Sequence, residues 1–297
     1  MNRRRTRRRL LAGLLALAFV AGVLLMLHEP ANRTRESLFS RDPFATEVAP
    51  TVLRSNFATA SEAAPTAPDR RGQLAIVIDD IGWTRAAGER VIALPGRLTL
   101  AVLPGTPAGA VLSRQAHAAG HEVILHQPMA AHGDASLGPG ALRAEATDDE
   151  IARIIAANLD ALPHGVGLSN HMGSLLTTRK PAMRAVMSAA ALRGVYFLDS
   201  RTTADTVAQS TARALAVPTL RRDLFLDDSL DPDRVETALD AALELAETRG
   251  HAVVIGHPHE VTLEVLERRM DEIRERVRLV PVSNLLRPIA GGQPVAN

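Results

Sequence analysis

From residue 74 onward, short apolar runs alternate with longer amphipathic segments, and this alternation is the strongest constraint on the fold. The apolar runs have strand length and lie at 74–78, 98–103, 122–125, 166–169, 195–198, 224–226, 252–255 and 278–281. The segments between them have helix length and lie near 84–93, 107–119, 148–161, 180–193, 204–214, 232–249 and 260–276. Strands that alternate with helices form a parallel sheet with crossover helices. A (β/α) barrel and an open doubly wound sheet both satisfy this pattern.

The residue composition excludes several kinds of chemistry. The chain has no cysteine, which excludes a disulfide framework, a thiolate-ligated metal and a thiol nucleophile. Lys180 is its one lysine, so no Gly-Lys-Ser/Thr phosphate-binding loop is present. No Gly-x-Gly-x-x-Gly follows a predicted strand, which disfavours a dinucleotide-binding sheet.

Basic residues are concentrated at the N-terminus. Residues 3–9 include six arginines, and without these the 34 basic side chains fall to 28, against 33 acidic ones. The rest of the chain therefore has no basic excess of the kind that nucleic-acid binding requires. We expect no nucleic-acid partner.

An apolar segment follows these arginines. Residues 10–27 are all apolar or small, and a transmembrane helix needs about 20 such residues, with about 17 as the lower limit. By the positive-inside rule, the sequence predicts a cytoplasmic N-terminus at 1–9, a membrane anchor at 10–28 and a body in the periplasm, held at the inner membrane. A cleaved signal peptide and a twin-arginine export signal are the alternatives, and cleavage would release a secreted body.

Residues 29–73 differ in composition from the segments on either side. Prolines at 30, 43, 50, 65 and 68 lie among Ala, Thr, Ser and Arg, without a sustained period of 2 or 3.6. This composition is typical of a linker. The sequence therefore predicts one folded domain, at 74–290.

Polar side chains lie where the predicted strands end. In both candidate folds, ligands bind at the carboxyl ends of the strands. The side chains at these ends are Asp79, Asp80, His126, Asn170, His171, Asp199, Arg201, Asp227, Asp228, His257 and His259, while Asp223 precedes a strand. One such residue alone is most often a turn residue. Six strands that deliver carboxylates and imidazoles to one rim instead predict a functional site.

The chemistry of these groups suits a metal-assisted hydrolysis. One carboxylate and two imidazoles can hold a divalent metal and leave positions open for water and substrate. Such a metal lowers the pKa of bound water toward about 7. A second carboxylate can then take a proton from the water, and a separate histidine can protonate the leaving group. We expect the side chains of Asp79 and Asp80 to diverge, so that one binds the metal and the other acts as base.

Six motifs surround these residues. They are IDDIG at 78–82, AGHEVILHQPM at 119–129, NHMGS at 170–174, FLDSRT at 197–202, RDLFLD at 222–227 and GHP at 256–258. In this order they resemble the divergent polysaccharide deacetylase family, a branch of the polysaccharide deacetylases, over about 74–286. The resemblance implies an irregular seven-stranded (β/α) barrel and a metal-dependent removal of acetyl groups from carbohydrate.

The resemblance also implies roles for single residues. The first aspartate of the pair corresponds to the catalytic base and the second to a metal ligand, which assigns these roles to Asp79 and Asp80. His126 corresponds to a metal-ligating histidine. His257 corresponds to the general acid.

The second metal histidine departs from the family's pattern. The wider family spaces its two metal histidines as His-x-x-x-His, but the fourth residue after His126 is Ala130, which cannot bind a metal. We expect His171, from the next strand, to replace it. The predicted ligands are then Asp80, His126 and His171, and the predicted ion is zinc.

Five further residues near the strand ends are the predicted substrate-binding residues. They are Trp83, Asn170, Asp199, Arg201 and Asp223. Few aromatic side chains follow residue 73, which favours a short carbohydrate or a polar groove over a long stacking cleft.

Two functions are open at this point. The first is an exported metal-dependent hydrolase that removes acetyl groups from envelope carbohydrate. The second is a catalytically silent domain of the same fold that binds a glycan or an envelope protein. The presence of Asp79 and His257 favours the hydrolase, because a protein that only binds needs neither.

Overall fold

The computed structural model describes residues 71–286. The strands are β1 (Gln73–Ile81), β2 (Thr99–Val102), β3 (Glu122–Met129), β4 (Gly165–Met172), β5 (Tyr196–Asp199), β6 (Thr219–Arg221), β7 (Leu224–Phe225), β8 (His251–Gly256) and β9 (Arg278–Leu279). The helices are α2 (Arg85–Ala93), α3 (Gly109–Ala118), α4 (Asp148–Asp160), the 3₁₀ helix η1 (Leu176–Thr178), α5 (Lys180–Arg193), α6 (Ala208–Ala214), α7 (Pro232–Arg249), α8 (Glu260–Arg276) and α9 (Val282–Leu285).

The predicted N-terminal anchor at 10–28 lies outside the described residues, as do the basic segment 1–9 and nearly all of the linker 29–73. Within 71–286, no helix is both long enough and apolar enough to cross a membrane. The anchor therefore stays a prediction from the sequence.

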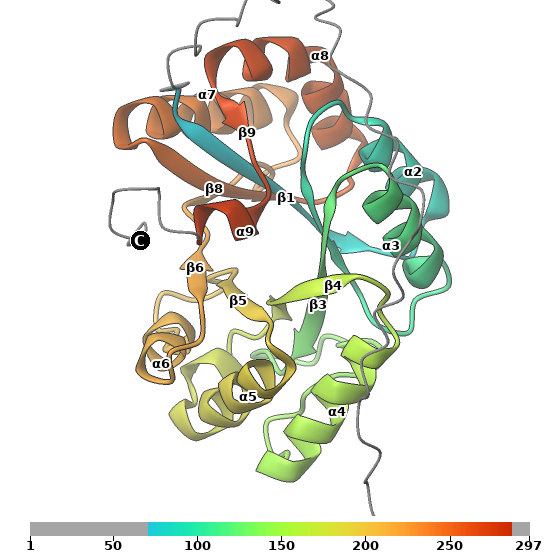
Figure 1. Ribbon diagram of the computed structural model, residues 1–297, viewed down its shortest axis with the longest axis vertical. Coiled ribbons are helices and arrows are strands. Elements are labelled where there is room, and N and C mark those ends of the chain that lie inside the picture. Colours follow the sequence, from blue (N-terminus) through green and yellow to red (C-terminus); the bar gives the residue numbers. More distant parts are fainter. Residues whose placement is uncertain (1–70, 287–297) are drawn as a thin grey trace, which may run out of the picture. The chain divides into compact units, whose positions relative to one another are not determined.

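All strand pairs are parallel, in the order β6-β5-β4-β3-β2-β1-β8-β7. Figure 1 shows helices α2 to α8 arranged around the outside of the strands. The two ends of this order are close in sequence, since β6 and β7 are separated by Arg222 and Asp223. The backbone N–H of Arg222 donates to the Asp199 carbonyl at 2.9 Å, and that of Asp223 donates to the Val253 carbonyl at 2.8 Å. The chain itself thus spans the gap, and the sheet is an incomplete barrel.

The prediction of a parallel α/β fold is confirmed, but residues 71–286 form nine strands and not seven. Two features account for the difference. The segment at the open edge of the barrel forms two short strands, β6 and β7, and the apolar runs predict only β7. The two-residue β9 pairs with Gln73 and Leu74 at the start of β1. The pairing of β1 with β2 begins further along, at Val77.

Alternate residues of the strands face two apolar layers, as strand geometry requires. Leu74, Ile76 and Ile78 of β1 belong to the outer layer, under the helices. Ala75 and Val77 belong to the inner layer, inside the barrel. Because both faces are buried, the strands are apolar almost throughout, which explains why the apolar pattern located them so well.

A polar network closes the N-terminal end of the barrel. The buried carboxylate of Glu122 accepts hydrogen bonds from Thr99 Oγ1 at 3.0 Å, from the Tyr196 hydroxyl at 2.8 Å and from the Ser283 N–H at 3.2 Å. The Val282 N–H donates to Thr99 Oγ1 at 3.1 Å. These contacts hold α9, which was not predicted, against the inner layer at this end of the strands.

Three strands extend by three or more residues beyond the apolar runs that predicted them. β1, β3 and β4 continue to residues 81, 129 and 172, whereas the runs stop at 78, 125 and 169. The ladder between β3 and β4 continues through polar residues, with Gln127 opposite Asn170 and Pro128 opposite His171. Asp79, His126, Asn170 and His171 therefore lie within strand ends, so strand geometry determines where these side chains point.

Candidate active site and metal centre

Asp79 and Asp80 lie at an irregularity in β1. In the ladder with β2, Ile78 is opposite Leu100 and Ile81 is opposite Val102, so β1 has one extra residue in this stretch, which is a β-bulge. Asp80 has a φ of 58°, a left-handed conformation that is uncommon for residues other than glycine. The bulge lets two consecutive side chains approach the same site.

Both carboxylates approach His126, which lies on the inner face of β3. Its Nε2 is 3.4 Å from Asp79 Oδ2 and 3.3 Å from Asp80 Oδ1. The expectation that the two aspartate side chains diverge is therefore wrong. The backbone conformation of Asp80 overrides the alternation that a regular strand would impose.

His171 reaches the same point from the neighbouring strand, β4. Its Nδ1 is 2.8 Å from Asp80 Oδ1, and its ring meets that of His126 edge-on, with centroids 5.1 Å apart. The structure thus brings together the three predicted ligands Asp80, His126 and His171, whose ligand atoms all lie within 4.8 Å of one another.

The donor atoms of this cluster fit a divalent metal. Asp80 Oδ1 is buried and, although it is close to both imidazoles, has no hydrogen bond of proper geometry. His126 Nδ1 is 2.8 Å from Ser169 Oγ, an outer contact of the kind that orients a ligating histidine and leaves Nε2 for the metal. Burial raises the pKa of Asp80, but its interactions with His126 and His171 outweigh burial and hold that pKa far below the usual range. Two nitrogens and one carboxylate oxygen are a donor set typical of catalytic zinc.

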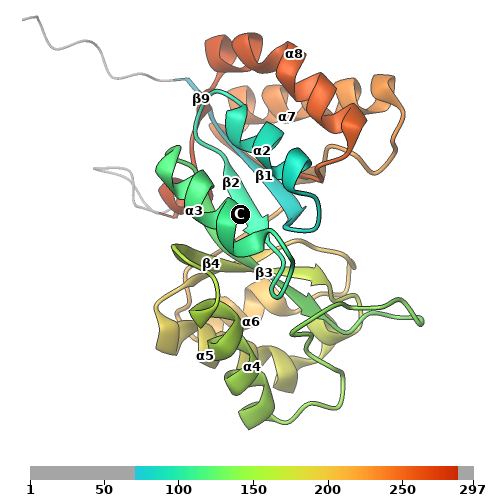
Figure 2. The ribbon, with the colours of Figure 1, turned by 90° about the vertical axis from the view of Figure 1, so that its right-hand side faces the viewer.

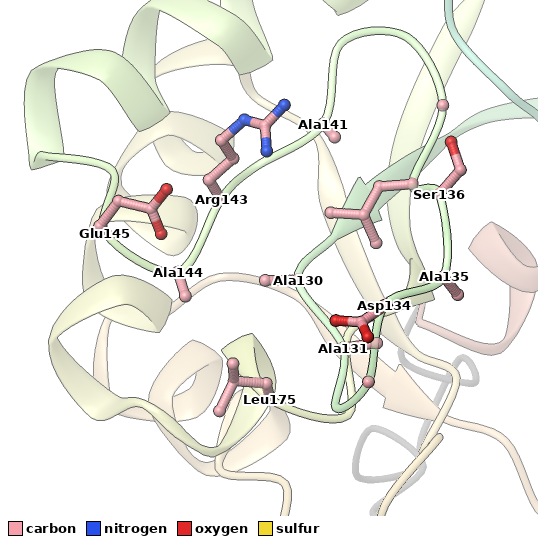
Figure 3. A pocket seen from close by; sticks show the side chains of 13 residues that line it. Ala130, Ala131, Asp134, Ala135, Ser136, Ala141, Arg143, Ala144, Glu145 and Leu175 are labelled. Atoms are coloured by element: carbon pink, nitrogen blue, oxygen red, sulfur yellow. The ribbon is translucent and has the colours of Figure 1, made fainter.

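Ala130, at the position where the wider family has its second histidine, lies outside this cluster. Its carbonyl accepts hydrogen bonds from the N–H groups of Leu175 and Leu176. Ala130 lines a separate pocket of about 470 Å³, formed mainly by the loop between β3 and α4. Figure 3 shows Asp134, Arg143 and Glu145 around this pocket, together with Leu175.

Asp79 is fully buried beside the cluster. Its Oδ1 has no hydrogen-bond partner among the described residues. Burial raises the pKa of Asp79, and the nearby His126 and His257 only partly oppose this effect. A buried carboxyl group with a raised pKa next to a possible metal site has the properties of a general base.

His257 follows β8 and is paired with Asp227, which follows β7. Its Nδ1 is 2.9 Å from Asp227 Oδ1, and its backbone N–H donates to Asp227 Oδ2 at 2.6 Å. Thr262 Oγ1 donates to the same Oδ2 at 2.8 Å. Burial lowers the pKa of His257, but the hydrogen bond and charge of Asp227, with the charges of Asp79 and Asp80, raise it to about 9. A protonated imidazole held in this way can serve as a general acid.

Asp227 is one of the strand-end residues and the last residue of the RDLFLD motif, but the sequence assigned it no role. A signal was available in the strand register. Leu224 is opposite Val254 and Phe225 is opposite Ile255 in the β7–β8 ladder. Continuing this register by two residues places Asp227 opposite His257.

Trp83 is the predicted substrate-binding residue that the structure leaves accessible. Its side chain is 55% exposed. It lines a pocket of about 270 Å³ together with His171, and a second pocket of about 220 Å³ together with Asp80 and His257. The indole therefore stands between two hollows that meet the site from different sides.

Asn170 and Asp199 are buried and shape the loops beside the site. Asn170 Oδ1 accepts from the Ser200 N–H at 3.0 Å, and its Nδ2 donates to the Met172 carbonyl at 2.8 Å. Asp199 accepts from the Arg201 N–H at 2.9 Å and from a threonine hydroxyl in the same loop. Their polar atoms are thus already used within the protein.

Arg201 and Asp223 occupy different environments. Arg201 is partly buried with a φ of 49°, and its carbonyl accepts a hydrogen bond from Arg222 at 3.0 Å. Asp223 lies away from the cluster, because its carboxylate accepts from the Val253 N–H at 2.8 Å and pairs with Arg249 at 2.6 Å. Asp223 therefore fastens the chain to the edge of β8 and does not reach the site.

Arg222 also supports the site from the gap between β6 and β7. Its guanidinium donates to the Ser200 carbonyl at 2.8 Å and lies 3.6 Å from the centre of the Phe225 ring. Phe225 in turn stacks on His257, with ring centroids 5.9 Å apart. This stack fixes one side of the His257 imidazole.

Comparison with known proteins agrees with this architecture. A model of the divergent polysaccharide deacetylase family matches residues 76–286. The chain is 38% identical to the uncharacterized protein YibQ of Escherichia coli (strain K12) over 233 residues. These residues are 78% of this chain and 73% of that protein. It is also 30% identical to an uncharacterized protein of Haemophilus influenzae over 217 residues, and these are 73% of this chain and 78% of that protein. The crystal structure of an uncharacterized protein of Agrobacterium tumefaciens C58 is 23% identical, with a TM-score of 0.68 over 74% of this chain and 92% of that one.

The incomplete parallel barrel, with carboxylates and histidines at the carboxyl ends of its strands, defines a protein of the polysaccharide deacetylase fold. The chain belongs to the divergent polysaccharide deacetylase family. The resemblance noted in its motifs is thereby confirmed.

The cluster predicts that His171→Ala abolishes tight metal binding. Removing one of three ligands that meet at one point should lower bound zinc, measured by elemental analysis after dialysis, to a small fraction of the wild-type amount. His259→Ala is the matched control. His259 belongs to a second group of metal-binding residue types, with Asp227 and His257, but the Asp227 carboxylate is already hydrogen-bonded to His257 and Thr262. Full metal in His171→Ala together with loss in His259→Ala would place the ion in the second group.

The Asp227–His257 pair predicts a pH dependence. In metal-free protein the imidazole of His257 should titrate near pH 9 by NMR. Asp227→Asn should lower the pKa of His257, because burial lowers that pKa and the charge of Asp227 then no longer opposes it. Since the folded pKa exceeds the unfolded value of about 6.5, the pair stabilises the fold fully below about pH 6.5 and progressively less as the pH rises through about 9. Asp228→Asn, at an exposed neighbour, should change little. An unchanged titration in Asp227→Asn would contradict the assignment.

Proposed function

We propose that the protein is a metal-dependent hydrolase that removes acetyl groups from carbohydrate of the cell envelope. The observation that carries the proposal is the convergence of Asp79, Asp80, His126 and His171 at the open end of a deacetylase-family barrel. The Asp227–His257 pair supports it, because it adds a candidate acid to a candidate base.

Asp80, His126 and His171 would hold the ion, for which zinc is our expectation. When bound, a divalent ion would act as a Lewis acid toward the acetyl carbonyl and make water more acidic. Ser169 would fix the orientation of the His126 ring, because its Oγ is 2.8 Å from His126 Nδ1. Asp80 contributes the negative charge that favours a cation at this position.

Asp79 and His257 would carry the proton transfers. Asp79 takes a proton from the attacking water, whose oxygen forms a new bond to the acetyl carbon. The bond from that carbon to the sugar nitrogen or oxygen then breaks, and the leaving atom receives a proton from His257. The products are acetate and the free amine or hydroxyl, and Asp227 holds the imidazole throughout in the orientation that its hydrogen bond sets.

Trp83 is the group that we propose to contact the sugar. Its exposed indole between the two pockets offers an apolar face for one ring, and both pockets are small. This favours a substrate recognised over one or a few sugar units.

A binding role without catalysis is the second candidate. The observation that favours it is Ala130, because the loss of the usual second histidine is a change that a shift of function would also produce. The two candidates differ in whether acetate is released.

The proposal predicts acetate release that depends on both proton-transfer residues. Asp79→Asn and His257→Ala should keep metal and fold, yet lower the rate of acetate release from acetylated envelope glycans by about 10²–10⁴-fold. The measurement compares wild type and both variants with zinc supplied, and Asp228→Asn serves as the charge-matched control. If wild type releases no acetate above a zinc-only blank but still binds the glycan, the binding role is correct.

We also propose that the N-terminal segment holds the body at the outer face of the inner membrane. The support is the arginine cluster at 3–9 followed by the apolar run 10–27. A reporter fused after Asn297 should be active if it requires export and inactive if it requires the cytoplasm. The opposite pattern would contradict this topology.

A further inference from the structure

The pocket formed by the loop between β3 and α4 has no part in the proposed hydrolysis, and we call it the loop pocket. Its volume is about 470 Å³, and its lining comes mainly from this loop, with Leu175 from the segment after β4. Figure 2 shows the loop projecting from the body of the protein between β3 and α4. The proposed metal ligands and proton-transfer residues do not line the loop pocket.

The loop pocket adjoins the hollow that contains His171 and Trp83. Ser136, Leu137 and Gly138 line both the loop pocket and the pocket of about 270 Å³ beside His171. Gly138 has a φ of 80°, and a Cβ added to it would have no neighbour within 4 Å, which indicates open space on that side of the loop. A ligand whose sugar contacts Trp83 can therefore extend past these three residues into the loop pocket.

Three charged side chains line the loop pocket. They are Asp134, Arg143 and Glu145, and in the view of Figure 3 the arginine lies between the two carboxylates. All three residues are exposed, and within residues 71–286 their side chains form no hydrogen bond or ion pair. The loop pocket thus offers groups of both signs to a ligand.

This mixture of charges restricts the ligand. A neutral sugar could bind these groups only through its hydroxyls, without charge pairing. A purely anionic group would be repelled by Asp134 and Glu145, and a purely cationic group would be repelled by Arg143. A ligand that carries both an ammonium and a carboxylate pairs with all three side chains, and amino acids and peptides carry both.

We propose that the loop pocket binds an amino-acid or short peptide substituent of the carbohydrate substrate. Arg143 would bind the carboxylate of the substituent through two N–H donors, and Asp134 and Glu145 would bind its ammonium. Leu175 and the alanines of the lining offer apolar contact to small side chains of the substituent. The inference rests on the proposed function only in placing a sugar beside Trp83, and it names what that sugar carries.

The test measures binding and not turnover. The full chain is purified in nonionic detergent as the Asp79→Asn variant, so that the probes are not consumed, and affinity is measured by calorimetry with zinc supplied. The main probe is N-acetylmuramic acid joined by an amide bond to alanyl-lysine, which carries one ammonium and one carboxylate. Three further probes are the same compound with an acetylated lysine side chain, the same compound with a C-terminal amide, and the methylamide of N-acetylmuramic acid.

The main probe should bind at least about tenfold more tightly than the methylamide, because it adds charge-assisted hydrogen bonds. Arg143→Gln should weaken the main probe by about tenfold and leave the C-terminal amide unchanged, since the amide lacks the carboxylate. Asp134→Asn/Glu145→Gln should weaken the main probe by a similar factor and leave the acetylated probe unchanged. Arg184→Gln and Glu264→Gln, at exposed positions on α5 and α8, are the matched controls and should bind all probes like the parent.

The proposal is overturned if the main probe binds no more tightly than the methylamide, or if Arg143→Gln weakens the acid and the amide equally. It is also overturned if a tetramer of N-acetylglucosamine binds more tightly than the main probe and loses this gain in the loop-pocket variants, because the pocket then holds further sugar units. An assay of acetate release by wild type separates the two proposals. Absent release together with the expected binding rejects the hydrolase and supports the peptide-binding pocket.

Discussion

The site depends on the alternation of side chains along parallel strands whose inner face is enclosed. Ala75 and Val77 point into the barrel, and continuing the same alternation carries Asp79 inward at the end of β1. On β3, Ile124 precedes His126 on the same inner face. The residues that fill the core and those that form the site are therefore successive layers of one interior, and apolar packing below sets the position of the polar groups above.

Polar contacts close the barrel at two places, its amino end and the open edge between β6 and β7. At the amino end, Glu122 holds α9 against the inner layer. At the open edge, Arg222 and Asp223 span the gap between β6 and β7, and each uses its side chain as well as its backbone. The same crossing places Phe225 and Asp227 beside His257, so the element that completes the barrel also orients the candidate acid.

The electrostatics of the site differ between its two aspartates, although they are neighbours in sequence. Burial dominates at Asp79 and raises its pKa, whereas two imidazoles dominate at Asp80 and lower its pKa. A left-handed residue in a bulge is what brings Asp80 to those imidazoles. A strained backbone conformation at a candidate site is commonly maintained for function, and here it separates the properties of two carboxyl groups that a regular strand would have pointed in opposite directions.

The sequence by itself determined the parallel α/β fold, the family, and the set of strand ends that carry polar residues, because burial on both faces produces apolar runs that are visible without a structure. It also singled out Asp80, His126 and His171 as a group that could meet, since neighbouring parallel strands end at one edge. Only the tertiary structure decided that Asp79 and Asp80 converge and that Asp227, and not Asp223, faces the site. These outcomes depend on strand register, on one backbone angle and on contacts between residues distant in the chain, none of which a local pattern contains.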